Sequence, residues 1–230
     1  MILATLFVSC ATNEKGLDIL SKIFSSTGIG LTEQDAADGI REALVNGTID
    51  GVEKVSKVDG YLGNAEIKIL LPPDAIEMEK ELRSIGLGKQ VDQALTSMNR
   101  AAEDAAMKAK PIFMAAIKNM TITDAINIVK GNNDAATRYL EKSTSSELNK
   151  QFQPAIKISL DKVNATKYWA TILTTYNKIP LVDQIDPNLP EYVTTKAIEG
   201  LFVMIANEEL KIRTDPVART SELLKKVFGN

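Results

Sequence analysis

The sequence predicts an all-α fold, an irregular bundle of several helices with one small extended or β insert near residues 60–72. Apolar residues return at helical spacing along most of the chain, and capping residues precede several of these stretches. Apolar residues make up 44% of the 230 positions and charged residues 25%, as in ordinary globular domains. A chain of this length can bury a core without disulfides or metals.

The first helices are predicted from the caps and the apolar spacing. Thr32 is a candidate N-cap for a helix that we expect to end at Gly47. The clearest helix is expected over residues 89–110, where apolar residues recur at steps of three and four. Half of this stripe is alanine, which would let a second helix approach closely. Its members are Val91, Leu95, Met98, Ala102, Ala105 and Ala109.

Further helices are predicted towards the C-terminus from the positions of caps, glycines and prolines. Because proline lacks an N–H and clashes with the preceding turn, we expect a break or a new start at Pro154. The other expected elements are a helix over 111–120, a helix capped by Thr123 that ends at Gly131, a helix capped by Asn133 or Asp134, helical structure over 145–178, a buried helix over 191–213, and a last helix from Asp215-Pro216.

Residues 60–72 do not fit a helix. Gly60 and Gly63 interrupt the pattern, residues 67–69 alternate between apolar and charged, and Pro72-Pro73 end the segment. We expect an extended strand or a short hairpin here. No linker rich in Gly, Ser or Pro divides the chain, so residues 17–230 are expected to form one helical domain.

The N-terminus carries a separate signal. Residues 1–9 are almost wholly apolar and are followed by Cys10, the only cysteine. This run is too short to cross a bilayer, but an apolar run, a small residue (Ser9) and a cysteine are typical of a bacterial lipoprotein signal. We therefore expect a signal over 1–9, lipid attachment at Cys10, a tether over 10–16, and a domain anchored to a membrane in the periplasm.

Two features depart from that signal. Phe7 stands where leucine is typical, and no Lys or Arg separates Met1 from the apolar run. A start placed too late would explain the missing basic residues. The alternative is a short hydrophobic arm with a buried free cysteine.

The composition excludes many chemistries. Without histidine there is no Ser–His–Asp triad or HExxH zinc site, and one cysteine allows no CxxC pair or four-Cys cluster. The net charge of −3, without an unopposed basic cluster, argues against nucleic acid. Residues 86–90 resemble a phosphate loop, but Arg83 and Gln90 replace its first Gly and its Ser/Thr. We expect no cofactor, no metal and no catalytic residue.

Polar residues on the predicted helices form the candidate site. Glu209 and Arg213 have the favourable i,i+4 order, and Glu103 lies beside the alanine stripe. These residues form either a structural network that joins helices or a pocket that holds an anionic ligand through its arginines. The candidates are Asn99, Glu103, Arg138, Tyr139, Glu209, Arg213 and Arg219.

Several short sequence segments are characteristic of one family when they occur together. They are GIREALVNG (39–47), DGYLGNAEIKILLPP (59–73), ELRSIGLG (81–88), NRAAEDAA (99–106), AATRYL (135–140), YVTTKAIEGLF (192–202) and EELKIRTDPVARTSELLKKVFG (208–229). From about residue 35 to the C-terminus, the chain resembles the bacterial domain of unknown function 4197 family. The resemblance implies an exported or lipid-anchored protein of Gram-negative bacteria with a helical domain. It carries over no activity and no site residues.

Three functions stay open at this stage. The first is a non-enzymatic module on a periplasmic lipid anchor that binds a partner or supports the envelope. The second is a small-molecule or lipid carrier with a pocket between helices. The third is a hydrolase based on carboxylates, for which a pair of convergent acids would be needed. The sequence identifies neither the protein or small-molecule partner nor which membrane, inner or outer, holds the anchor.

Overall fold

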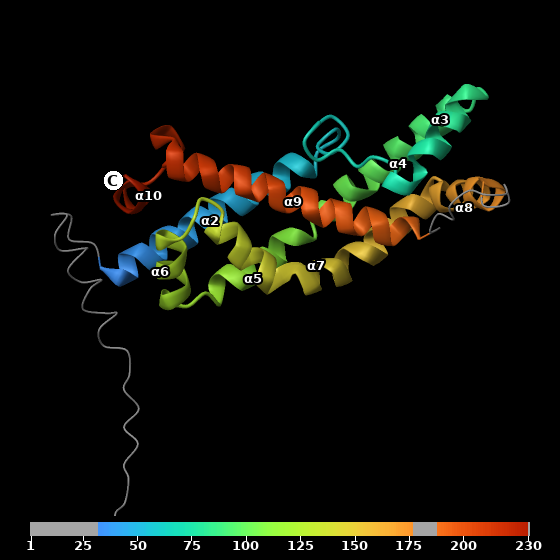
Figure 1. The fold of residues 1–230 in the computed structure, drawn as a ribbon. Helices are drawn as coiled ribbons and strands as arrows, with labels where there is room; N and C mark the ends of the chain where they lie inside the picture. Colours follow the sequence, from blue (N-terminus) through green and yellow to red (C-terminus); the bar gives the residue numbers. More distant parts are fainter. Residues whose placement is uncertain (1–31, 177–187, 230) are drawn as a thin grey trace, which may run out of the picture.

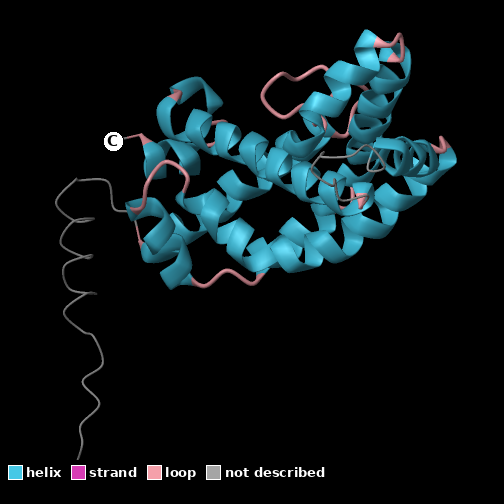
Figure 2. Ribbon diagram, turned by 45° about the vertical axis from the view of Figure 1, so that its right-hand side comes forward, coloured by secondary structure: helices cyan, strands magenta, loops and turns pink. Residues whose placement is uncertain are grey.

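The computed structural model describes residues 32–176 and 188–229, and it confirms the all-α class. The described residues form helices joined by turns and loops, without a strand (Figure 2). The expected signal and tether, with Cys10, lie outside the described residues. The α-helices are α2 (Glu33–Val55), α3 (Ile76–Ser84), α4 (Gly88–Ala106), α5 (Ala109–Lys118), α6 (Ile122–Lys130), α7 (Ala135–Lys162), α8 (Ala165–Tyr176), α9 (Leu189–Thr214) and α10 (Glu222–Phe228), with 3₁₀ turns at Pro73–Ala75 and Pro216–Ala218.

The long helices run along an elongated bundle (Figure 1). Helix α7 packs against α9 and α4, and α2 packs against α9, α5 and α6. One end of the bundle holds α6, α10 and the start of α2, whereas the other end holds α3, the start of α4, and α8. The described domain therefore begins and ends at the same end of the bundle.

The alanine-rich stripe of α4 lies in the core. Val91, Met98, Ala102 and Ala105 are buried, and Leu95 is half-buried. Alanine side chains allow the backbone of α4 to lie close to α7 and α9, both of which pack against it. The predicted central position of this helix is confirmed.

Two other expectations differ in detail: α6 is capped by Thr121 rather than by Thr123, and α4 ends at Ala106 rather than at residue 110.

Two predicted helix breaks are absent from the structure. Thr32 caps α2 through a capping box with Asp35, as its sequence suggests. However, α2 continues past Gly47, which lies where α9 crosses: a Cβ at this position would lie 3.5 Å from the Cβ of Glu208. Helix α7 likewise continues through Pro154. This proline is exposed, so water can solvate the carbonyl of Lys150 that loses its helical donor.

The expected strand or hairpin near residues 60–72 is corrected by the structure. Residues 60–67 form successive turns, and residues 68–72 have no regular structure. The alternation of burial is present, because Ile67, Ile69 and Leu71 are buried while Lys68 and Leu70 are exposed. No neighbouring strand pairs with this segment among the described residues, and polar side chains of α4 bind its backbone instead.

Candidate functional site

The structure divides the seven candidate residues among several places. Asn99 and Glu103 lie on α4, beneath the 59–71 segment. Glu209 and Arg213 lie on α9, against the start of α7. Arg138 is exposed and pairs with Asp134, with 2.7 Å between Nε and Oδ2. The seven residues do not converge on one pocket.

Glu103 holds the turn that follows α2. Its Oε1 accepts the backbone N–H groups of Tyr61 (3.1 Å) and Leu62 (3.2 Å), and its Oε2 accepts Nη1 of Arg100 at 2.6 Å. Arg100 also binds Asp59, which lies in the left-handed region with φ of 67°. The buried carboxylate is therefore fully occupied by protein donors and is a structural clamp.

The side chain of Asn99 makes the two hydrogen bonds with Ile69 that a neighbouring strand would make in a sheet. Its Oδ1 accepts the N–H of Ile69 at 2.9 Å, and its Nδ2 donates to the carbonyl of Ile69 at 2.8 Å. Nδ2 also donates to the carbonyl of Leu95. Because the amide satisfies both backbone groups of a buried residue, the segment stays extended locally without a sheet.

Tyr61 fastens the same segment to α9. Its hydroxyl donates to the carbonyl of Ala197 at 2.6 Å, and the side chain is fully buried. Burial, together with the charge of Glu103, raises the pKa of Tyr61 far above its ordinary value. Gly200 makes room for this contact, since a Cβ there would lie 2.9 Å from Cε1 of Tyr61.

Glu209 caps α7 from a distant helix. The N-cap residue of α7, Asp134, makes no capping hydrogen bond with its side chain. Instead, Oε1 of Glu209 accepts the N–H of Ala136 at 3.0 Å, and Oε2 accepts the N–H and the hydroxyl of Thr137, each at 2.8 Å. A carboxylate at a helix N-terminus is favoured by the helix dipole. The anion bound at this end of α7 is thus the protein's own.

The two arginines near Glu209 also have internal partners. Arg213 donates through Nε to Glu209 and through Nη2 to the carbonyl of Ile128, both at 2.9 Å. Its guanidinium lies 5.5 Å from the ring centroid of Phe228 on α10. Arg219 donates to the carbonyls of Ile212 and Arg213, at the end of α9. Neither arginine is left open for a ligand.

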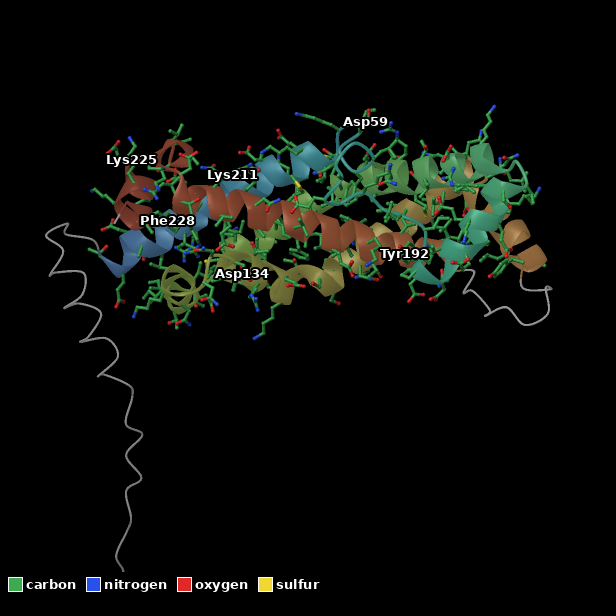
Figure 3. The ribbon with its side chains drawn as sticks, turned by 45° about the horizontal axis from the view of Figure 1, so that its top comes forward. Asp59, Asp134, Tyr192, Lys211, Lys225 and Phe228 are labelled. Carbon is green, nitrogen blue, oxygen red and sulfur yellow. The ribbon has the colours of Figure 1, made fainter. Side chains whose placement is uncertain are left out.

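The space beside this cluster is small. A cavity of about 20 Å³ is lined by residues of α2, α7, α9 and α10, including Glu209, Arg213 and Phe228. That volume accommodates about one water molecule. Figure 3 shows Asp134, Lys211 and Phe228 towards the α10 end, away from Asp59 near the middle of the molecule. An anionic ligand pocket among the candidate residues therefore lacks room in this structure.

Tyr139 and Glu208 complete the polar contacts between helices. The half-buried Tyr139 donates its hydroxyl to the carbonyl of Ala116 on α5 at 3.4 Å. Glu208 accepts Lys54 of α2 at 2.5 Å and Lys211 at 2.9 Å. Burial by itself would raise the pKa of Glu208, but the hydrogen bonds from both lysines lower it below the ordinary value.

A much larger hollow lies at the opposite end of the bundle. This groove of about 770 Å³ runs between α3, α4 and α8, and we name it the Trp169 groove. Trp169 is buried, yet its Nε1 atom has no hydrogen-bond acceptor among the described residues. An unsatisfied buried donor is unusual in a folded protein and calls for an explanation. The apolar wall consists of Leu82, Leu87, Ala94, Val163, Ala165 and Trp169.

Sequence reasoning did not find this groove. Its wall comes from three helices, and none of its residues carries a catalytic motif. The only signal in the sequence was the single tryptophan. Because a buried indole usually finds an acceptor for its N–H, the surroundings of this side chain were worth attention. Which helices would surround it depends on tertiary packing, which the spacing of apolar residues does not specify.

The described residues contain neither a metal-binding cluster nor a single membrane-spanning helix. No group of three or more Asp, Glu, His or Cys side chains in the described ranges is arranged to hold a metal ion. Over those ranges, no single helix has the length and apolar character needed to span a membrane. Helices α5 and α6 meet that test only as a pair, which is bent by 103°.

The comparisons with other proteins identify a family without a described activity. No curated protein and no solved structure matches the chain significantly. The family model described as Protein of unknown function (DUF4197) matches residues 30–229. This range covers nearly the whole chain and every described helix. The chain therefore belongs to the DUF4197 family of proteins of unknown function.

Proposed function

We propose that this chain is a lipid-anchored, non-enzymatic protein of the bacterial periplasm that binds a small molecule in the Trp169 groove. The observation that carries the proposal is the groove itself, a hollow of about 770 Å³ with an apolar wall between three helices.

The size of the groove supports a small molecule. About 770 Å³ falls within the range of roughly 300–1,000 Å³ that is usual for ligand sites. Its apolar wall, which is flanked by a few polar side chains, also fits the usual composition of such sites. Binding is favoured over catalysis because Glu103, Glu209, Arg213 and Arg219 are all engaged by internal partners.

The anchor is supported by the apolar residues before Cys10 and by the arrangement of the bundle. The described domain starts at the α10 end, and the Trp169 groove lies at the other end, beside α3 and α8 (Figure 1). A tether that precedes α2 would thus hold the groove on the side away from the membrane. A diacylated cysteine would supply a firm attachment, because two acyl chains anchor stably where one does not.

Membrane fractionation tests the anchor. In the native host, we expect the protein in the membrane fraction, and we expect Cys10→Ser to release it into the soluble periplasmic fraction. Ser9→Ala is the matched control, because it keeps a small residue before the cysteine and should leave the protein bound. Retention of the Cys10→Ser protein in the membrane would overturn the lipid anchor.

Native mass spectrometry tests the binding function. The full chain purified from its host should carry a non-covalent adduct. Ala94→Phe places a ring in the groove and should remove that adduct, whereas Ala170→Phe, on the exposed side of α8, should retain it. Circular dichroism would verify that both variants fold, with Ala94→Leu as a smaller block. An adduct that persists in folded Ala94 variants would contradict binding in this groove.

A further inference from the structure

The Trp169 groove presents little charge to a ligand. Lys89 and Asp92 are the two charged residues that line it among the described residues. The carboxylate of Asp92 is neutralised by Arg83, with 2.8 Å between Oδ1 and Nη2. Lys89 lies in the first turn of α4, and its side chain is exposed, so its ammonium stays hydrated. The groove therefore holds no buried charge that a ligand of opposite sign would have to neutralise.

The uncharged polar side chains of the groove fall into two sets. The hydroxyls of Thr96 and Ser97 donate to the carbonyls of Asp92 and Gln93 in their own helix, each at 2.8 Å. The side chains of Gln90 and Gln93 are exposed, and their carboxamides form no hydrogen bond with the described part of the chain. Because a carboxamide has both donors and an acceptor, this pair can bind the hydroxyl groups of a ligand.

The polar and apolar linings come from different elements. Residues three and four apart share one face of a helix, so Gln90, Gln93 and Ser97 form a row along α4. The apolar wall includes Leu82 of α3 and Val163, which precedes α8 and is 53% exposed. A ligand with an apolar body and a hydroxylated, uncharged head would therefore match both linings.

We propose that the Trp169 groove binds an uncharged single-chain lipid whose head group carries hydroxyls, the chemistry of a monoacylglycerol. The acyl chain lies against the apolar wall, and the hydroxyls bind the carboxamides of Gln90 and Gln93. This assignment rests on the function proposed above and names the ligand class of that same groove. An anionic head group would gain little from Lys89, because an exposed ion pair is weak in water, and any charged head would lose hydration on entering the groove.

Three probes with the same acyl chain isolate the charge of the head group. Glycerol monolaurate is uncharged, laurate is an anion and lauroylcholine is a cation. Each would be titrated below its critical micelle concentration into the full chain with Cys10→Ser, while the emission of Trp169, the only tryptophan, is recorded. Glycerol monolaurate should bind at least about threefold more tightly than either charged probe, the effect of one net hydrogen bond. Laurate binding as tightly as glycerol monolaurate would overturn the uncharged assignment.

Variants of the lining test the two glutamines. The double variant Gln90→Ala/Gln93→Ala should weaken glycerol monolaurate about two- to tenfold and leave laurate unchanged. Gln153→Ala, at an exposed position of α7 outside the groove lining, is the matched control and should change neither affinity. Lys89→Gln should also leave glycerol monolaurate unchanged. An unaltered affinity of the double variant for glycerol monolaurate would overturn the role of the carboxamides.

Failure of the lipid assignment can be told apart from failure of the binding function. If no probe binds while Ala94→Phe still removes a co-purified adduct, the lipid assignment falls and the binding function stands. If the adduct persists in the folded Ala94→Phe protein as well, both fall.

Discussion

Glu209 on α9 caps the N-terminus of α7 through Thr137, whose backbone N–H and hydroxyl both donate to Oε2 at 2.8 Å. The two residues lie far apart in the sequence, and this contact fixes the start of one long helix against the end of another. The carboxylate also holds the buried guanidinium of Arg213. Loss of the carboxylate would leave the start of α7 without its cap and Arg213 without its counter-charge.

Glu209→Ala should therefore destabilise the domain strongly, by about 3 kcal/mol, because it leaves the largely buried Arg213 without a counter-charge. Glu209→Gln keeps the shape and some of the hydrogen bonds, so its effect should be smaller. Urea unfolding followed by circular dichroism measures both. The control is Glu199→Gln on the exposed face of α9, which should change the stability by less than about 0.5 kcal/mol. Equal stabilities for the Glu209 and Glu199 variants would contradict the capping role.

Asn99→Ala should loosen the 59–71 segment. The variant leaves the N–H and the carbonyl of Ile69 buried without partners, which should cost about 2 kcal/mol. Hydrogen exchange at Ile69 should accelerate more than exchange in α7. Asn119→Ala, at an exposed site, should change neither quantity. Unchanged protection of Ile69 would show that the amide of Asn99 does not hold this segment.

Two glycine substitutions within helices should have opposite signs. Gly200→Ala places a Cβ 2.9 Å from Cε1 of Tyr61 and 3.1 Å from the Cβ of Ile67, so overpacking should destabilise by about 1–3 kcal/mol. Gly47→Ala meets only an ordinary contact of 3.5 Å, so the gain in helix propensity should stabilise by up to about 1 kcal/mol. Thermal unfolding of both variants decides this, and a stabilised Gly200→Ala protein would refute the close packing of α9.

The ion pairs of Glu208 should make stability depend on acid pH. Because the hydrogen bonds from Lys54 and Lys211 lower the pKa of Glu208 in the folded state, the unfolded chain takes up its proton first as the pH falls. The stabilisation is present above the ordinary pKa and is lost as the pH falls through the folded pKa. Glu208→Gln should cost about 1 kcal/mol at pH 7 and progressively less below about pH 4.5.

Urea titrations between pH 7 and pH 3 provide this measurement. Glu53→Gln, an exposed position on α2, is the control and should show a small difference at every pH. A penalty for Glu208→Gln that stays constant across this range would contradict the charged contact with the two lysines.

The sequence predicted the fold class and most helices because local signals determine them. The alanine stripe of α4 and the Thr32 cap appear as expected. Gly47 and Pro154 were misleading as helix breaks. The packing of α9 favours a glycine inside α2, and solvent exposure allows a proline inside α7. Local patterns alone do not contain this information.

Less of the candidate site could be predicted from the sequence. Asn99, Glu103 and Glu209 are all buried, although only Glu103 was placed beside an apolar stripe by the sequence. Their partners, which include the backbone of Tyr61 and of Thr137, follow from the arrangement of distant segments. The Trp169 groove depends in the same way on how α3, α4 and α8 meet, so its discovery required the structure.

The most direct test of the binding function uses the indole of Trp169, which lines the groove, as a reporter. A single indole resonance is expected in the ¹H–¹⁵N spectrum of the full chain with Cys10→Ser, because Trp169 is the only tryptophan. Addition of an organic extract of the native host should shift this resonance in a saturable manner as a ligand settles against the indole ring, and Ala94→Phe should abolish the shift. A resonance that stays in place throughout the titration of the unblocked groove would contradict ligand binding at Trp169.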